Sequence, residues 1–421
     1  MLPRGINALS GYTLPSKLGR HEYIHQSRIN AVEQPIVTSD KTMVLVSYDP
    51  GTRSLFRLQK SRQSTSDDDG NLIISHRGLP GQQNTDTKNG RSLSIFLRFL
   101  QSWSVFHHII TIYPVFLVIP IVSCAIRWPL PTITPLAISV LCSYIIPKRR
   151  RIKSLRSHLI WKLLVSYFPI RLYRSTELPT NKKYIFSCHP HGILSYGVFA
   201  TFATETLGFG ELFPGIETTL LTLDSNFRIP VFRDYLLALG FGSVARESIE
   251  KILTKGGKDD KGEGHAVAIV VGGAKESLEA KPGTFRAVIK NRKGFIKLAI
   301  RTGADIVPVL AFGENDLYDV ADLHTKPMLS KAHLLFKKLF GFTIPFFYTK
   351  GPYRFDFGIM PHRRPVSVVI GRPIATLKEQ DNFNTDDIDE VHERYLKELE
   401  YMWNEWKDVF APSRIEELTF L

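Results

Sequence analysis

Two uncharged apolar runs constrain the fold of this chain more than any other feature. The first covers Ile109–Ile126, eighteen residues without a charge, and the second covers Thr132–Ile146. As a helix the first run would be about 27 Å long, close to the roughly 30 Å hydrocarbon core of a bilayer. The alternative is a helical hairpin buried in a soluble domain. Because buried helices seldom lack a polar face over such a length, we expect a hairpin embedded in a membrane.

The charge around these runs supports the same interpretation. The chain has 54 Lys and Arg against 40 Asp and Glu, a formal net charge of +14. Between Arg91 and Arg174 there are twelve Lys or Arg and no Asp or Glu. Basic flanks on both sides of a hairpin keep both flanks cytosolic and attract anionic lipid head groups. We therefore expect membrane lipid as the partner of this charge, and no nucleic acid.

Composition divides the chain into three expected regions. Residues 1–90 are polar and Gly-rich with little periodicity, which predicts a cytosolic tail that is mostly disordered; an apolar run at 42–48 could form a strand or a docking segment. Residues 91–153 hold the hairpin and its basic flanks, and residues 154–421 form a cytosolic domain of globular composition. Three cysteines are too few for a disulfide framework, and no Cys/His spacing predicts a metal site.

Strand and helix patterns alternate through the third region. Short apolar runs predict strands at 184–188, 265–271, 306–312 and 366–370. A helix is predicted at 293–301, ending at Gly303, because glycine readily adopts the left-handed conformation that terminates helices. An amphipathic helix is predicted at 386–410. The alternation predicts an α/β fold, a sheet covered by helices.

Two histidines follow the first of these strands directly. His189 and His191 flank a proline, and Gly192 comes next. Ligands of open α/β sheets bind at the carboxyl ends of the strands, and a pKa near 6.5 suits imidazole to proton transfer. The alternative is a structural turn, in which one histidine bonds to the backbone and the other is exposed.

Two more segments place functional groups in comparable positions. Gly272 and Gly273 end the strand at 265–271 and lead to Glu276, and such turns present backbone N–H groups to anions. Arg292 and Lys293 open the helix at 293–301. Together with the histidine turn, these segments supply a base, a carboxylate and an anion cradle on one sheet.

The sequence here resembles the type 2 diacylglycerol acyltransferase family, with its monoacylglycerol and wax-alcohol relatives. The resemblance spans roughly residues 95–421 and rests on six motifs in order. They are Tyr167-Phe168-Pro169, His189-Pro190-His191-Gly192, Ser243–Ser248, Gly272–Ser277, Arg292–Phe295 and Val307–Asn315. It implies an acyltransferase-like mixed sheet, acyl-CoA and a neutral lipid alcohol such as diacylglycerol as substrates, no further cofactor, and a location at the endoplasmic reticulum membrane and the lipid droplet surface.

The expected mechanism centres on histidine. We expect His191 to be the general base, with His189 as the alternative, and Glu276 to hold the imidazole in its productive tautomer. The similar glycerophospholipid acyltransferases use His-x-x-x-x-Asp. This chain has Leu194 five residues after His189 and Tyr196 five residues after His191, so the carboxylate must come from elsewhere in the sequence.

The expected substrate-binding residues fall into three groups. They are Gly192, Gly272 and Gly273 near the oxyanion donors, Arg246, Arg292 and Lys293 as partners of the CoA phosphates, and Tyr167, Phe168 and Pro169 at the membrane exit. For the cations the alternative is a solvated basic surface. For the aromatic segment we leave open whether it packs the domain onto the membrane or shapes an acyl tunnel.

Three other functions are weighed against this one. A Cys188 nucleophile is disfavoured because neighbouring strand residues such as Cys188 and His189 point to opposite faces, so Cys188 is expected in the core. A membrane-anchored hydrolase would use Ser195, whose surroundings nearly match Gly-x-Ser-x-Gly. A non-catalytic lipid-droplet protein would need the hairpin but gives no reason for the histidine turn. The acceptor alcohol and the formation of a homo-oligomer are left open.

Overall fold

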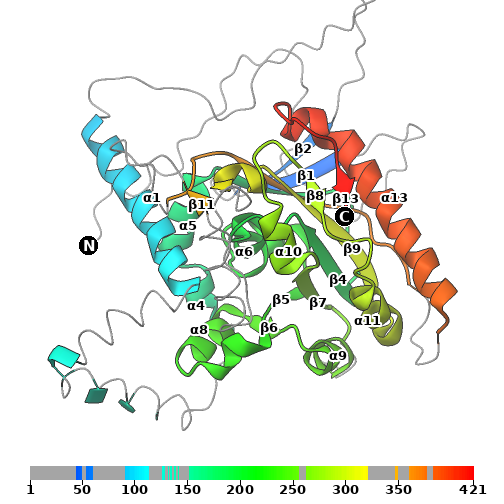
Figure 1. The fold of residues 1–421 in the computed structure, drawn as a ribbon, viewed down its shortest axis with the longest axis horizontal. Coiled ribbons are helices and arrows are strands. Elements are labelled where there is room, and N and C mark those ends of the chain that lie inside the picture. Colours follow the sequence, from blue (N-terminus) through cyan, green and yellow to red (C-terminus); the bar gives the residue numbers. More distant parts are fainter. Residues whose placement is uncertain are drawn as a thin grey trace, which may run out of the picture.

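The described part of the chain is built on one mixed sheet. The computed structural model describes residues 44–49, 54–59, 91–112, 151–255, 262–320, 347–348, 360–376 and 383–421, with isolated residues between 126 and 141. Within these residues nine strands pair in the order β2-β1-β3-β12-β9-β4-β7-β5-β6 (Figure 1). They are β1 (Val44–Asp49), β2 (Ser54–Gln59), β3 (Ile170–Arg174), β4 (Tyr184–His189), β5 (Glu217–Thr222), β6 (Phe241–Ser243), β7 (His265–Val270), β9 (Asp305–Phe312) and β12 (Val366–Ile370).

The strand directions confirm a mixed α/β fold. β9, β4, β7, β5 and β6 run parallel to one another, whereas β12 is antiparallel to β9 and parallel to β3. Every residue of β4 and of β9 is buried, as expected for central parallel strands covered on both faces. Their carboxyl ends therefore meet at one edge of the sheet.

Helices cover both faces of the sheet. They are α1 (Arg91–Ile112), α4 (Lys153–Arg156), α5 (Leu159–Tyr167), α6 (Tyr196–Phe202), α7 (Phe209–Leu212), α8 (Phe232–Leu239), α9 (Arg246–Lys255), α10 (Gly273–Leu278), α11 (Gly294–Thr302) and α13 (Thr385–Phe410). One hydrophobic core joins α1, α5 and α6 to one face, and a second joins α9, α11 and α13 to the other (Figure 1). Within β4, Phe186 and Cys188 belong to the first core and Ile185 to the second.

Most of the elements predicted from the sequence are present. The strands predicted at 184–188, 265–271, 306–312 and 366–370 are β4, β7, β9 and β12, and the amphipathic helix is α13. The helix predicted at 293–301 is α11, and it ends at Gly303 with φ of +65°. The apolar run at 42–48 contributes to β1, which pairs with β2 and β3 and so ties part of the N-terminal region to the sheet.

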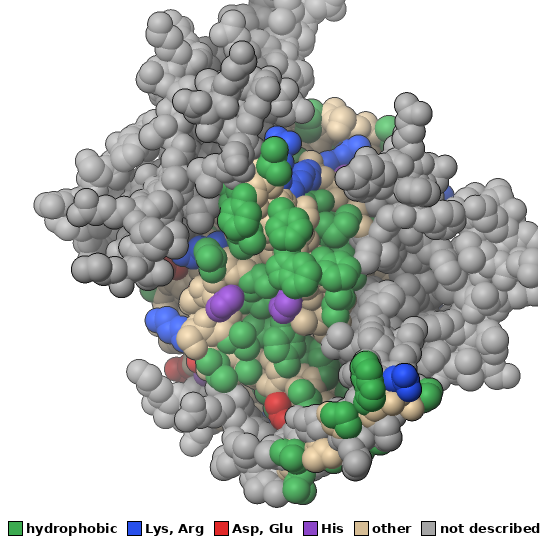
Figure 2. Space-filling view, turned by 90° about the vertical axis from the view of Figure 1, so that its left-hand side faces the viewer, with side chains coloured by type: hydrophobic (Ala, Val, Ile, Leu, Met, Phe, Trp, Pro, Cys, Tyr) green, Lys and Arg blue, Asp and Glu red, His purple; other side chains and the backbone are tan. Residues whose placement is uncertain are grey.

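Most of the expected membrane hairpin falls on residues outside the described ranges. α1 includes only the first four residues of the first apolar run, Ile109–Ile112. No helix among the described residues has the length and apolar character needed to cross a bilayer. α1 has hydrophobic residues on both an exposed and a buried side: Phe99 and Trp103 are exposed, whereas Val105 and Ile109 are buried. Figure 2 shows hydrophobic side chains gathered on the side of the molecule where α1 lies.

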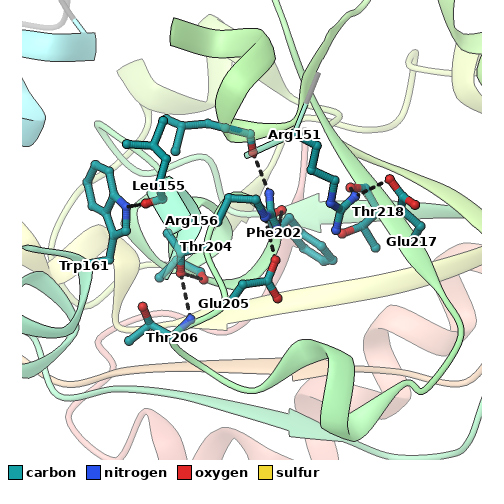
Figure 3. Close-up of polar contacts among 12 residues, drawn as sticks. Arg151, Leu155, Arg156, Trp161, Phe202, Thr204, Glu205, Thr206, Glu217 and Thr218 are labelled. Atoms are coloured by element: carbon teal, nitrogen blue, oxygen red, sulfur yellow. Dashed lines mark hydrogen bonds and ion pairs between the residues drawn. The ribbon is translucent and has the colours of Figure 1, made fainter. Parts of the chain in front are cut away.

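A buried arginine fixes the start of the domain after the basic cluster. Arg156 in α4 is 2% exposed, and its guanidinium donates to the carboxylate of Glu205 at 2.6 Å and to the carbonyl oxygens of Leu239 at 2.5 Å and Phe202 at 3.1 Å (Figure 3). Burial lowers the pKa of Arg156, and Glu205 opposes this shift. Because the charge is paired and its N–H groups are used, Arg156 holds α4 against α6 and α8.

Candidate active site at the carboxyl end of β4

β4 carries the histidine motif to the carboxyl edge of the sheet. The strand ends at His189, and the chain turns through His191 and Gly192 before α6 begins at Tyr196. Gly192 has φ of +58°, and a Cβ atom there would lie 2.5 Å from Cγ of Glu314. The tight turn therefore requires glycine, both for its backbone conformation and for space.

His189 is sealed inside the protein with both ring nitrogens used. Its side chain is fully buried, Nδ1 lies 2.8 Å from Oε1 of Glu276, and Nε2 lies 3.1 Å from the hydroxyl of Tyr395 in α13. Nδ1–H donates to the carboxylate, and the Tyr395 hydroxyl donates to Nε2. The ring therefore links α10 to α13 beneath the turn.

Glu276 is a fully buried carboxylate that accepts three N–H groups. Besides the ring of His189, it accepts the backbone N–H of His191 at 2.8 Å and that of Val288 at 3.0 Å. Gly272 leaves room for it, because a Cβ atom at that position would lie 2.4 Å from Cδ of Glu276. The Glu276 carboxylate thus connects α10 to the histidine turn and to the segment that contains Val288.

The expected hydrogen bond between Glu276 and an imidazole is formed with His189 instead of His191. We expected the carboxylate to hold the imidazole of His191, but the hydrogen bond to an imidazole goes to His189, and His191 is reached through its backbone N–H. The physical reason is the strand geometry: His189, the last residue of β4, turns its ring toward α10 and α13, whereas His191 lies beyond the strand.

The His191 imidazole is partly exposed and has a defined tautomer. Its Nδ1–H donates to the carbonyl oxygen of Gly192 at 3.0 Å, and the hydroxyl of Ser195 lies 3.3 Å from the same nitrogen. The lone pair is therefore on Nε2, to which no hydrogen bond is formed by the described residues. Burial lowers the pKa of His191, opposed by the Gly192 carbonyl and by Glu276. A neutral imidazole with an available nitrogen can accept a proton.

Glu314 is a second buried carboxylate, which sequence reasoning did not include among the site residues. It is 2% exposed and accepts the backbone N–H groups of Tyr196 at 2.7 Å and Gly197 at 2.9 Å, at the start of α6. Burial raises the pKa of Glu314 to about 7, and the two backbone donors oppose this shift. It lies against Gly192, so it supports the turn from the α6 side. The signal available was its place in the Val307–Asn315 motif.

The predicted cations are not gathered at one point. Arg292 is exposed and lines a cavity of about 340 Å³ with Lys275 and Val288, and the backbone N–H of Val288 bonds to Glu276. Lys293 forms an ion pair with Asp389. Arg246 follows β6, the third strand from β4, which at about 4.8 Å per strand places it roughly 14 Å along the sheet edge.

The other predicted residues divide between the turn and the core. Gly272 and Gly273 lie at the start of α10, directly before Glu276. Tyr167 and Phe168 are buried, whereas Pro169 is exposed. The Tyr167 hydroxyl donates to the carbonyl of Pro361 at 2.7 Å, and the Phe168 ring lies 4.4 Å from that of Tyr196. This segment packs α5 against the start of α6.

Two alternative nucleophiles can be judged from their surroundings. Cys188 is fully buried in the core on the α6 face, as predicted, and burial, with Glu276 adding to it, raises the pKa of its thiol well above the ordinary value. The Ser195 hydroxyl donates to the carbonyl of His191 at 2.7 Å. Since Nδ1 of His191 is a donor, it cannot take the serine proton. In the described part of the chain no group of three or more His, Cys, Asp or Glu is arranged to hold a metal ion.

Comparison with known proteins gives consistent matches. The sequence profile described as "Diacylglycerol acyltransferase" matches residues 123–420. The chain is 46% identical over 275 residues to "Diacylglycerol O-acyltransferase 1" of Schizosaccharomyces pombe, covering 65% of this chain and 78% of that protein. It is 44% identical over 273 residues to "Diacylglycerol O-acyltransferase 2A" of Umbelopsis ramanniana (65% and 76%), and 38% identical over 271 residues to "2-acylglycerol O-acyltransferase 1" of Bos taurus (64% and 79%). No solved structure matches significantly.

Proposed function

We propose that this chain, which belongs to the diacylglycerol acyltransferase family and is an acyltransferase, transfers the acyl group of acyl-CoA to the free hydroxyl of diacylglycerol. The observation that carries the proposed chemistry is the partly exposed imidazole of His191, whose Nδ1–H is bound to the Gly192 carbonyl. This hydrogen bond leaves Nε2 as the basic nitrogen at the edge of the sheet.

The proposed reaction is a direct transfer. Nε2 of His191 takes the proton of the glycerol hydroxyl while that oxygen attacks the thioester carbonyl. The carbonyl oxygen of the tetrahedral intermediate becomes negative, and backbone N–H groups near Gly192, Gly272 and Gly273 are the proposed donors to it. The C–S bond then breaks, and the CoA thiolate leaves with the proton carried by the imidazolium. No acyl-enzyme is formed.

Glu276 and His189 act in this proposal as positioning residues. The carboxylate fixes the backbone of His191 through one N–H and holds the His189 ring beneath the turn. Its negative charge also favours the imidazolium that forms on His191 during the reaction. His189 remains the alternative base, but it would need the Tyr395 hydroxyl to leave Nε2.

The proposed substrates give roles to the basic residues around the site and to the membrane. We propose that Arg292 and Lys293 bind the CoA phosphates, because Arg292 lines a cavity together with Val288, a hydrogen-bond partner of Glu276, and Lys293 follows Arg292 in sequence. Arg246 lies farther along the edge and is proposed to belong to the basic surface that faces lipid head groups. The proposed location is the endoplasmic reticulum membrane and the lipid droplet surface, with the membrane hairpin and its basic flanks within residues 91–153.

A panel assay tests the function. Microsomes containing the protein receive one labelled acyl-CoA together with diacylglycerol, monoacylglycerol and a long-chain alcohol, and the labelled products are separated. Labelled triacylglycerol as the main product is the expected result. A main product of diacylglycerol or wax ester would assign one of the other acceptors, and labelled free fatty acid would indicate a hydrolase instead.

A further inference from the structure

A fully buried histidine on α1 has no hydrogen-bonding partner. His108 is 0% exposed, and neither Nδ1 nor Nε2 has a hydrogen bond among the residues that the structure describes. Burial lowers the pKa of His108 to about 3, and the neighbouring His107 adds to this shift, so the ring is neutral at cytosolic pH. Leaving a buried polar group unpaired is unfavourable, and nearly all such groups in proteins find a partner.

The ring of His108 is surrounded by aromatic side chains. Its centroid lies 4.2 Å from that of Phe199, 5.2 Å from that of Tyr196 and 6.1 Å from that of Trp161. These three side chains come from α5 and α6 and make apolar walls around a polar ring. The three rings contribute only apolar surface next to the ring nitrogens, so an acceptor supplied by a ligand would give the N–H of His108 its missing hydrogen bond.

This aromatic cage is close to the proposed base. Tyr196 follows Ser195, whose hydroxyl bonds to the carbonyl of His191, and the backbone N–H of Tyr196 is held by Glu314. The first turn of α6 therefore has the His191 turn before it and the His108 ring beside it.

The cage also lies near the surface and near the apolar sequence. His107, the preceding residue, is only half-buried, and its Nδ1 likewise has no hydrogen bond among the described residues. Trp103 and Phe99 lie on the same exposed face of α1, about one and two turns before His107. Figure 2 shows that hydrophobic side chains cover much of the side of the molecule on which α1 lies. α1 ends four residues after His108, within the first uncharged run.

We propose that the N–H of His108 binds an ester carbonyl of the acylglycerol acceptor and so positions its free hydroxyl for His191. A neutral imidazole has one donor, and an acylglycerol offers ester carbonyls as its strongest acceptors. His108 is in this role a binding residue for the lipid. The inference rests on the proposed function and adds a determinant of acceptor selectivity to it.

The test compares two acceptors that differ only in their carbonyls. A 1,2-dialkylglycerol keeps the free hydroxyl and both chains of 1,2-diacylglycerol but has no ester. The wild-type protein is expected to prefer the diacyl acceptor. His108→Phe should reduce that preference in kcat/KM about 3–10-fold, the effect of one neutral hydrogen bond, mainly by raising KM for diacylglycerol. The melting temperature of the ligand-free protein should stay equal or rise, because phenylalanine fills the cage without an unpaired nitrogen.

The controls separate binding from packing. His108→Gln retains an N–H donor and should keep most of the preference. His392→Phe is the matched control, because His392 is also buried and its Nε2 has no hydrogen bond within the described part of the chain, but it lies in α13 on the other face of the sheet; its ratio should equal that of the wild type. His108→Leu replaces the phenylalanine variant if that one fails to fold.

Several results would overturn the inference while leaving the proposed function intact. One is a wild-type protein that makes triacylglycerol but does not distinguish the two acceptors. The others concern His108→Phe: an unchanged ratio of kcat/KM between the acceptors, an equal loss of kcat/KM with both, or a change confined to KM for acyl-CoA. A wild-type protein that makes no triacylglycerol would instead remove the proposed function.

Discussion

The three N–H groups that converge on Glu276 make Glu276→Gln the most informative change near the site. Glutamine has the same shape but one carbonyl oxygen and one amide nitrogen. With its oxygen at the Oε1 position it can still accept from His189 and Val288, but its NH₂ group then faces the N–H of His191. One bond to a charged acceptor is lost and two donors oppose each other.

The expected loss follows from these contacts. A hydrogen bond to a charged group contributes about 1.5–3 kcal/mol, and the backbone N–H of His191 is left without its partner. For a domain of this size we expect the melting temperature to fall by about 5–10 °C. Turnover should fall by about tenfold or more, because a shift of about 1 Å in the turn moves the base from its productive position.

Thermal unfolding and turnover in detergent measure both effects. Glu393→Gln is the matched control, because Glu393 lies in α13, is exposed and pairs with Lys397; exposed ion pairs of this kind contribute about 0–1 kcal/mol. If Glu276→Gln were as stable and as active as Glu393→Gln, the assignment of Glu276 as the anchor of the turn would be wrong.

Two further predictions concern the buried groups on either side. Tyr395→Phe leaves Nε2 of His189 without its donor and should destabilise the protein by about 1–3 kcal/mol, seen in denaturant unfolding, while turnover changes less than in a His191 variant. Because the pKa of Glu314 is raised from 4.5 to about 7, the protonated carboxyl stabilises the folded protein. This contribution to the free energy of unfolding is fully present below pH 4.5, and about 3 kcal/mol of it is lost as the pH rises to 7. Glu314→Gln should remove it, so the melting temperature of the variant relative to the wild type should rise over this pH range; a constant difference would contradict the assignment.

The sequence predicted those parts of the fold that depend on local pattern. The apolar run at 184–188 gave β4 within one residue, because a strand buried on both faces must be apolar throughout. Gly303 marked the end of α11 because its conformation is left-handed. Opposite directions of neighbouring strand residues separated Cys188 from His189 correctly.

The pairings across the site could not be derived in this way. Glu276 and His189 are 87 residues apart, and Tyr395 is 206 residues from His189. Tyr395 shares the helical spacing of the other core residues of α13, so periodicity alone predicts packing and gives no sign of its bond to a ring nitrogen. The strand order, which separates Arg246 from β4, likewise depends on topology rather than on motif order.

The turnover of His191→Ala at pH 7 tests the central claim most directly. The side chain is partly exposed, and among the described residues its ring bonds only to groups within its own turn, so the variant should melt within a few degrees of the wild type. Loss of a general base predicts triacylglycerol synthesis about 10²–10⁴-fold slower. A folded His191→Ala protein that kept more than about a third of wild-type turnover would contradict the assignment of His191 as the base.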